Sequence, residues 1–233
     1  ASARRVLARA MRANALGLAA CLFVPAAALQ PAGRACGKPF WKVVEQCIPK
    51  SSLDMDKQIC ALREFSGDRF SKSSIGKESG AVLSKAERQV ANAKELIEKA
   101  LLEFHEAVNI LNSLALRNET FLTKQYSGDL QVDHQASQDD WVYNIEVVDN
   151  VIGRLKTMGS QLSGLQVFLK MYESRCPLPD EASKRWNEVC DHVQIAVELL
   201  FSADTVLRSA SEALHDLYDV HLASYEDSPD DEV

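Results

Sequence analysis

Apolar residues recur every three or four positions over three long stretches of this chain, and charged residues fill most of the positions between them. In the first stretch, residues 81–114, large apolar side chains alternate with alanine. This stripe consists of Leu83, Ala86, Val90, Ala93, Ile97, Ala100, Phe104, Ala107, Leu111 and Leu114. A mean spacing of about 3.5 residues predicts an amphipathic helix, and the alanines allow a neighbouring helix to approach closely.

The second and third stretches have the same spacing and are also predicted to be long helices. The second stripe consists of Trp141, Val148, Val151, Leu155, Met158, Leu162, Leu165, Leu169 and Tyr172. The third consists of Trp186, Val189, Val193, Ala196, Leu200, Ala203, Leu207, Ala210, Leu214 and Leu217. The two tryptophans are therefore expected in the core. Gly153, Gly159 and Gly164 lie within the second helix and either permit a close helix contact or mark a bend.

Stripes of this kind are stable in water only when they pack against each other. We therefore predict an all-α fold in which residues 81–225 form an elongated, antiparallel, coiled-coil-like three-helix bundle. The short connection at residues 175–179 requires the second and third helices to be antiparallel. The connection at residues 118–136 is longer and polar, and the simplest order of the three helices is up-down-up.

The segment before the bundle, residues 29–80, is predicted to form a small helical cap. Apolar residues at helical spacing predict one short helix over residues 40–48, which we expect to end at Pro49. A second short helix is predicted over residues 55–62. Residues 66–80 are rich in Ser and Gly and are expected to be a flexible connector.

The N-terminal residues 1–28 are predicted to be removed. An apolar run from residue 15 to residue 29 follows Met11, the expected start, and small residues favour cleavage after Ala28. These features are typical of a secretory signal peptide, and Pro25 argues against a core helix. The residues ending at Cys21 also resemble a bacterial lipobox, which is an alternative interpretation.

Composition and charge restrict the possible partners. The chain has 233 residues, of which 46% are hydrophobic and 25% charged, as in ordinary globular proteins. Its net charge of -7 and the lack of a Lys/Arg stripe argue against nucleic acid as a partner. No second apolar run reaches ~18 residues, so we expect contact with a membrane only through an anchor outside this sequence. Residues 226–233 are predicted to be an acidic tail.

The cysteines predict a disulfide-linked cap. Cleavage of the signal peptide would leave Cys36, Cys47, Cys60, Cys176 and Cys190. In a secreted protein these should mostly form disulfides, and the odd number leaves one thiol that is free or links two chains into a dimer. The up-down-up order would gather all five at one end of the bundle. A bond between Cys176 and Cys190 is awkward because ~15 Å of helix separates them, so we expect at least one of them to reach the N-terminal segment.

Candidate chemistry is sparse. His105, His134, His192, His215 and His221 have no metal-binding spacing and are expected to be scattered over the solvent-facing surface. Cys190 and His192 should lie on different faces of one helix, so they do not form a nucleophile–base pair. We predict that the protein is not an enzyme and holds no cofactor or metal. Asn118-Glu119-Thr120 is an N-glycosylation sequon in a predicted loop, which indicates a glycoprotein.

Phe40 and Trp41 are the candidate ligand-binding residues. These adjacent aromatic residues lie in the predicted cap, at the end of the bundle that holds the cysteines. One interpretation is that they pack the cap onto the bundle. The other is that they form a partly exposed patch for a protein ligand.

The signal peptide, the alanine-rich seams of residues 81–225, the grouped cysteines and the acidic tail together resemble the surface proteins of African trypanosomes. That group includes the invariant surface glycoproteins, the haptoglobin–haemoglobin receptor and the alanine-rich coat proteins. The resemblance implies a protein that stands upright on a parasite surface and binds a host serum protein or shields the membrane. Members of the group carry a transmembrane segment or lipid anchor after the bundle, and this sequence shows neither. The short N-terminal helices also differ from the long first helix of those receptors.

Three functions follow from these features. The first is a secreted or cell-surface glycoprotein that binds a host or other extracellular protein through its cysteine-rich distal end. The second is a structural coat or spacer protein without a specific ligand. The third is an intracellular coiled-coil adaptor, in which the N-terminal apolar run is not a signal peptide.

Overall fold

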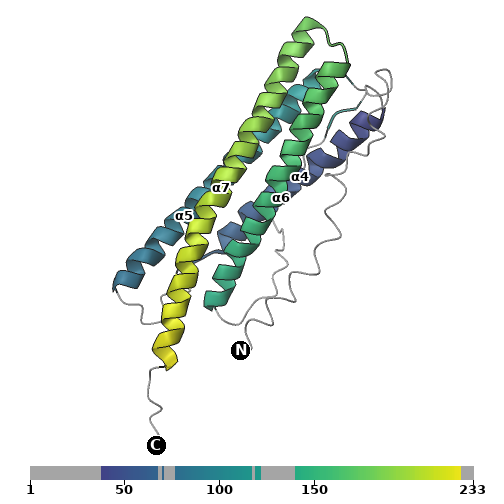
Figure 1. Cartoon of the computed structure of the whole chain (residues 1–233). Helices are drawn as coiled ribbons and strands as arrows, with labels where there is room; N and C mark the ends of the chain where they lie inside the picture. The colour runs from purple at the N-terminus through teal and green to yellow at the C-terminus, as the bar shows by residue number, and fades with distance from the viewer. Residues whose placement is uncertain (1–37, 68–69, 71–76, 117–118, 122–139, 227–233) are drawn as a thin grey trace, which may run out of the picture.

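The computed structural model describes residues 38–67, 70, 77–116, 119–121 and 140–226, and these residues form an all-helical fold. Four long helices lie side by side in an elongated bundle (Figure 1). They are α4 (Lys38–Glu64), α5 (Lys77–Ser113), α6 (Asp140–Arg175) and α7 (Asp180–Glu226). The predicted all-α class is confirmed. The bundle has one helix more than the three expected, because the predicted cap is part of it.

The four helices form a ring in which α4 and α7 are diagonal to each other. Each of these two helices packs mainly against α5 and α6. Figure 1 shows that α5 and α6 run in one direction and that α4 and α7 run in the other. The predicted antiparallel pairing of α6 with α7 is therefore confirmed, whereas the predicted up-down-up order is wrong. Residues 114–139 can reach roughly 80 Å when extended, which is enough to return the chain along the bundle and leave α5 and α6 parallel.

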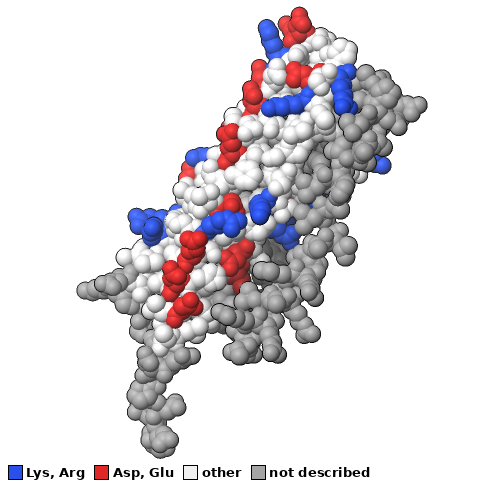
Figure 2. All heavy atoms as spheres, in the orientation of Figure 1, with Lys and Arg blue, Asp and Glu red and all other residues white. Residues whose placement is uncertain are grey.

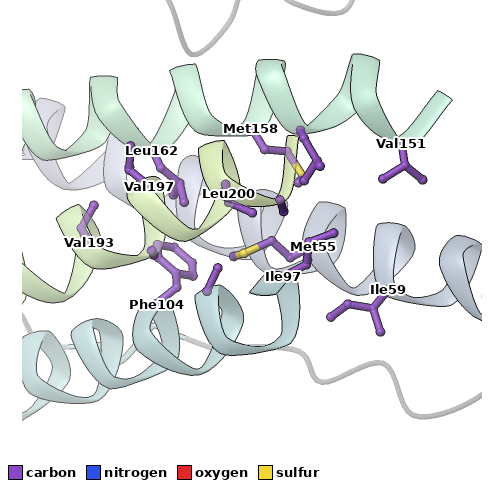
Figure 3. Close-up of a cluster of buried hydrophobic side chains, with 14 of the residues drawn as sticks. Met55, Ile59, Ile97, Phe104, Val151, Met158, Leu162, Val193, Val197 and Leu200 are labelled. Atoms are coloured by element: carbon purple, nitrogen blue, oxygen red, sulfur yellow. The ribbon is translucent and has the colours of Figure 1, made fainter. Parts of the chain in front are cut away.

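The three predicted apolar stripes form the core. All their residues are buried except Leu114, which is partly buried against the core. Figure 3 shows the middle of this core, where side chains from all four helices meet. Its labelled residues are Met55, Ile59, Ile97, Phe104, Val151, Met158, Leu162, Val193, Val197 and Leu200. The stripes were predictable because each helix presents one continuous apolar face.

Helix α4 continues through Pro49, which corrects the prediction of two short helices separated at that proline. Val44 and Ile48 before the proline and Met55 and Ile59 after it are all buried, so both halves present a single apolar stripe. A proline inside a helix costs ~3 kcal/mol, but full burial of each large apolar side chain contributes ~2 kcal/mol. Packing of both halves therefore outweighs the lost backbone hydrogen bond.

The ends of the connector between α4 and α5 are ordered, which differs from the flexible connector predicted for residues 66–80. The Asn144 side chain of α6 accepts a hydrogen bond from the Ser66 backbone N–H (3.3 Å) and donates one to the Ser66 carbonyl (3.0 Å). Phe70 is completely buried and meets the Trp141 ring edge to face. Phe70 therefore belongs to the core, although the polar residues around it in the sequence resemble a linker.

Local features explain where α5 ends and how α6 passes α7. Beyond Ser113, Ala115 has a φ of 50°, a left-handed conformation that ends helices and usually belongs to glycine. In α6, a Cβ at Gly159 would lie 3.2 Å from the Phe201 ring, so this glycine permits a close contact. At Gly153 and Gly164 a Cβ would meet nothing within 4 Å, and α6 continues through both.

Several predictions concern residues outside the described ranges. These include Met11, Ala28 and Cys21 of the predicted signal-peptide region, Cys36, Asn118 of the sequon, His134 and residues 227–233 of the acidic tail. Among the helices that the structure describes, none is long and apolar enough to cross a membrane.

Candidate functional site: the aromatic end of the bundle

One end of the bundle is closed by a group of aromatic rings, which we call the aromatic end cluster. It lies where α4 begins, α6 ends and α7 begins. The Phe40 ring stacks on Phe168 with centroids 4.7 Å apart and lies 4.2 Å from Tyr172. The Trp41 ring lies 5.9 Å from Phe121. The cluster consists of Phe40, Trp41, Phe121, Phe168, Tyr172 and Trp186.

Hydrogen bonds hold the rings of this cluster in place. The fully buried Trp186 donates from Nε1 to the Leu169 carbonyl (3.1 Å), which joins α7 to α6. Phe121 exchanges two hydrogen bonds with the Asn112 side chain: its N–H donates at 2.6 Å, and its carbonyl accepts at 3.0 Å. Burial raises the pKa of the Tyr172 hydroxyl. The cluster is therefore a rigid, well-packed plug.

The two candidate ligand-binding residues occupy different positions in this plug. Phe40 is only 5% exposed, so it belongs to the core and not to an exposed patch. Trp41 is half-buried and packs against Tyr172 and Phe121. Both residues pack α4 onto the bundle, the first of the two predicted interpretations. An exposed binding patch that includes Phe40 is incompatible with this geometry.

The α6–α7 turn beside the aromatic end cluster contains Cys176. Cys176 is buried and disulfide-bonded, and its N–H donates to the Tyr172 carbonyl (2.8 Å). The turn leads into α7, whose first residues Asp180 and Glu181 are acidic and exposed. Negative side chains stabilise the N-terminus of a helix through its dipole. Pro177, Pro179, Lys184 and Arg185 are also exposed on this surface.

The other three cysteines of the described ranges differ from their predicted role. Cys47, Cys60 and Cys190 are thiols and not halves of disulfides. Cys47 and Cys60 share one continuous helix, which places them ~20 Å apart along its axis, beyond the ~7 Å that a disulfide allows. The expected gathering of all cysteines at one end is also wrong. Cys60 lies one turn before Glu64, which bonds Tyr143 near the start of α6, far from the α6–α7 turn.

Cys190 is not arranged as a nucleophile. Burial, followed by the charge of Glu173, raises its pKa to about 11, so the thiolate is disfavoured at neutral pH. His192 points to α5, where its Nδ1 lies 2.7 Å from Glu103 Oε2. The prediction that Cys190 and His192 lie on different faces is therefore confirmed.

Each of the four described histidines contacts another helix. His215 is exposed and the other three are partly buried, so the expected solvent-facing position is confirmed for His215 alone. His105 Nε2 of α5 lies 2.9 Å from the buried Ser52 Oγ of α4. His215 Nε2 of α7 lies 3.0 Å from Asp149 Oδ2 of α6. His221 of α7 stacks on Trp141 with centroids 4.9 Å apart. Charge patterns along one helix do not reveal these pairings, because the partners lie far away in the sequence.

Ser211, Asp149 and His215 combine residue types that serve as catalytic triads in hydrolases. Here the carboxylate lies in the middle: Ser211 Oγ donates to Asp149 Oδ1 (2.5 Å), and His215 contacts Oδ2. Activation of a serine requires a base that bonds its hydroxyl and accepts its proton, and the carboxylate normally orients that base. This group instead links α6 to α7.

A shallow hollow of about 310 Å³ lies between the end of α4 and the first half of α5. Its lining combines apolar groups with Arg63, Lys94 and Glu87, and thus has no single charge. Figure 2 shows a similar mixture of acidic and basic residues along one face of the bundle. Within the described ranges, no group of three His, Cys, Asp or Glu side chains is placed to hold a metal ion.

Comparisons of the chain with known protein families, characterised proteins and solved structures found no match. The resemblance to trypanosome surface proteins therefore remains a prediction from the sequence pattern.

Proposed function

We propose that the chain is a non-enzymatic helical ectodomain of a secreted or cell-surface protein. The main support is Cys176, which is disulfide-bonded in the α6–α7 turn. Disulfides persist in oxidising compartments such as the secretory pathway and the extracellular space, and are rare in the cytosol. The predicted signal peptide and the predicted sequon at Asn118 point to the same compartment.

We further propose that the aromatic end presents the binding surface for an extracellular protein. Because Phe40 is buried, the contacts must come from exposed groups of the α6–α7 turn, such as Pro177, Pro179, Lys184 and Arg185. The rings beneath them hold this surface rigid, and a rigid surface loses little conformational entropy on binding. In this proposal the aromatic residues support the binding surface from below.

Two alternatives remain under the same fold. A coat or spacer protein would use only the length of the bundle, since the 47 residues of α7 span ~70 Å. An intracellular adaptor would need Cys176 to be reduced in cells. The resemblance to trypanosome surface proteins is kept as a proposal about which group of ectodomains this chain belongs to.

Expression of the complete chain in cells with a secretory pathway tests the compartment. We expect entry into that pathway and a glycan at Asn118, detected as a mass decrease after treatment with a glycan-removing amidase. Asn118→Gln is the matched control and should show no decrease. Retention of an unmodified chain in the cytosol would contradict the proposal and favour the intracellular adaptor.

Charge reversal tests the binding surface. A Lys184→Glu/Arg185→Glu variant should lose binding to a purified serum-protein fraction by at least about tenfold if these side chains contact the ligand. A variant with Lys85→Glu, an exposed residue near the other end of the bundle, should bind like the unmodified protein. Equal binding of all three proteins would reject the turn as the contact surface, and no binding by any of them would favour the spacer.

A further inference from the structure

The middle of α6 and α7 presents an outer surface that is almost free of charge, which we call the uncharged face. Residues 157–169 of α6 contain no charged residue, and residues 192–203 of α7 contain only Glu198 and His192, which is turned to α5. Figure 2 shows a mainly white area over the middle of these two helices. The outer side of a helix in water normally carries charged groups. Depletion of charge is instead typical of the centre of a protein–protein interface.

Two large apolar side chains are exposed along the uncharged face. Phe201 of α7 is 45% exposed, although its ring lies against Gly159 of α6. Val167 of α6 is 57% exposed and follows Gln166, whose side chain donates to the Cys190 carbonyl of α7. Both apolar groups therefore lie beside the contact between α6 and α7, where a partner that covers the face would remove them from water.

The hydroxyl groups of the uncharged face are already hydrogen-bonded within their own helices. Each donates to the carbonyl four residues earlier, over 2.8 to 3.0 Å. These residues are Ser160, Ser163, Ser202 and Thr205. A hydroxyl bonded in this way can be covered by a partner without leaving a buried donor unpaired. The face can therefore lose its water at little cost.

Charges at the edge of the face indicate what covers it. Lys170 of α6 and Asp191 of α7 are both exposed, and both charges act on Cys190, which places them at one level of the bundle. A two-fold axis parallel to the helices would lay α6 of one copy on α7 of another and bring Lys170 to the partner's Asp191. An axis across the helices would lay α6 on α6 and bring Lys170 towards the partner's Lys156. Opposite charges therefore favour the parallel axis, and the surface is complementary to itself.

We propose that the uncharged face binds a second copy of this chain about a two-fold axis parallel to the helices. A stretch of about 15 residues is ~22 Å long, and two neighbouring helices are ~20 Å wide. Each copy would then bury roughly 450 Å², or about 900 Å² for the pair, which is at the low end for specific interfaces. The net charge of -7 also opposes association. The expected dimer is therefore weak and reversible, and it does not depend on the proposed compartment.

Sedimentation velocity of the purified complete chain tests the self-association. We expect monomer at about 10 μM and a growing fraction of dimer towards about 1 mM, and the dimer should dissociate again on dilution. Val167→Glu would bury an unpaired charge in the face and should weaken association at least about tenfold. Leu102→Glu is the matched control, because Leu102 is an apolar residue of α5 that is 66% exposed, and this variant should associate like the unmodified chain.

Three outcomes of this experiment would overturn the proposal. They are a chain that stays monomeric at about 1 mM, a dimer that persists on dilution, and an association that Val167→Glu leaves unchanged. If the chain stays monomeric and Val167→Glu abolishes binding to the serum-protein fraction, the face belongs to that ligand and not to a second copy.

A charge exchange tests the two-fold arrangement. Lys170→Glu and Asp191→Lys should each weaken self-association at least about fivefold, because like charges then meet at both symmetry-related contacts. In a mixture of the two variants, the introduced glutamate of one copy meets the introduced lysine of the other. The mixture should therefore associate about as well as the unmodified chain, which a fluorescent label on one variant makes visible. An attraction confined to one chain cannot produce this rescue, and a mixture that stays monomeric would exclude the proposed axis.

Discussion

Helices α5, α6 and α7 hold together in a different way from α4. The first three share long apolar stripes, and in α5 and α7 buried alanines bring the two helices close. Helix α4 carries Pro49 in its middle and buries the polar residues Ser51 and Ser52 against the bundle. Its ends are fixed by the aromatic end cluster and by the Glu64–Tyr143 bond. The three helices therefore define the rod, whereas α4 becomes a helix of the bundle mainly through its tertiary contacts.

The largest expected effect comes from removing the Trp186 ring, which contacts both α4 and the other helices of the bundle. Trp186→Ala deletes a completely buried indole and its hydrogen bond to Leu169, and should lower the free energy of unfolding by about 4 kcal/mol. Urea denaturation followed by circular dichroism measures this loss. Trp41→Ala, at a half-buried position of the same cluster, is the comparison and should cost clearly less. Equal losses would mean that the cluster has no buried centre.

A core truncation in α4 should separate the two parts of the bundle. Met55→Ala leaves a cavity where α4 faces the other helices and should cost about 3 kcal/mol. If α4 depends on tertiary contacts, hydrogen exchange should speed up in α4 more than in α7. Leu200→Ala in α7 is the matched truncation and should speed up exchange in all four helices. A uniform response to Met55→Ala would show that α4 is no less cooperative than the rest.

Substitution of the internal proline should strengthen α4. Pro49→Ala restores a backbone N–H within the helix, and we expect the free energy of unfolding to rise by about 1 kcal/mol. Part of the gain is offset because alanine leaves the unfolded chain more flexible. Thermal unfolding measures the change. A lower Tm would mean that the bundle requires the geometry that proline imposes.

The smallest effect concerns pH. Burial lowers the pKa of His105 below 6.5, although the charge of Asp56 acts in the opposite direction. The folded protein then binds fewer protons than the unfolded chain below about pH 6.5, so stability is lost as the pH falls through that value towards the lowered pKa. Solvent screening keeps the effect below about 1 kcal/mol. The groups that face His105 from α4 are Ser52 and Asp56.

Hydrogen exchange at pH 7.5 and pH 5.5 measures this dependence. Backbone amides of α4 and α5 should be less protected from exchange at the lower pH, and His105→Gln should reduce this loss of protection. Asp54 acts in the opposite direction, because burial raises its pKa despite Lys50, Lys57 and Arg154. Its protonation therefore favours the folded state as the pH falls through the raised pKa. A pH dependence that His105→Gln leaves unchanged would assign the effect to another group.

These differences explain how much of the fold the sequence could predict. The stripes at residues 83–114, 141–172 and 186–217 are predictable because an apolar heptad pattern that continues over five heptads is specific to a packed helix. Helix α4 was divided at Pro49 because local propensity disfavours proline within a helix, whereas burial of Met55 and Ile59 depends on helices distant in the sequence. The sequence shows apolar residues at helical spacing on both sides of Pro49, but it does not show that they share one face of a single helix. That assignment requires the partner helices.

The candidate site was predictable only in part. Phe40 and Trp41 are candidates because they are adjacent aromatic residues in the predicted cap, but a sequence pattern does not distinguish a plug from an exposed patch. The cysteine predictions failed for Cys47, Cys60 and Cys190 because they assumed an up-down-up order, and the long connection at residues 114–139 permits a parallel pair instead. The importance of Tyr172 and Phe121 was missed because their contacts with Trp41 arise only in the folded bundle.

The central claim is that α4 is the fourth helix of the bundle along its whole length, and a cross-link from its second half tests this directly. A photo-cross-linking amino acid replaces Lys57, an exposed residue of α4 whose charge acts on Asp54, as does the charge of Arg154 of α6. Mass spectrometry should then find the cross-link in α6 near Arg154, midway along the bundle. Cross-links confined to residues around the α6–α7 turn would instead place residues 55–62 in a terminal cap and contradict the four-helix arrangement.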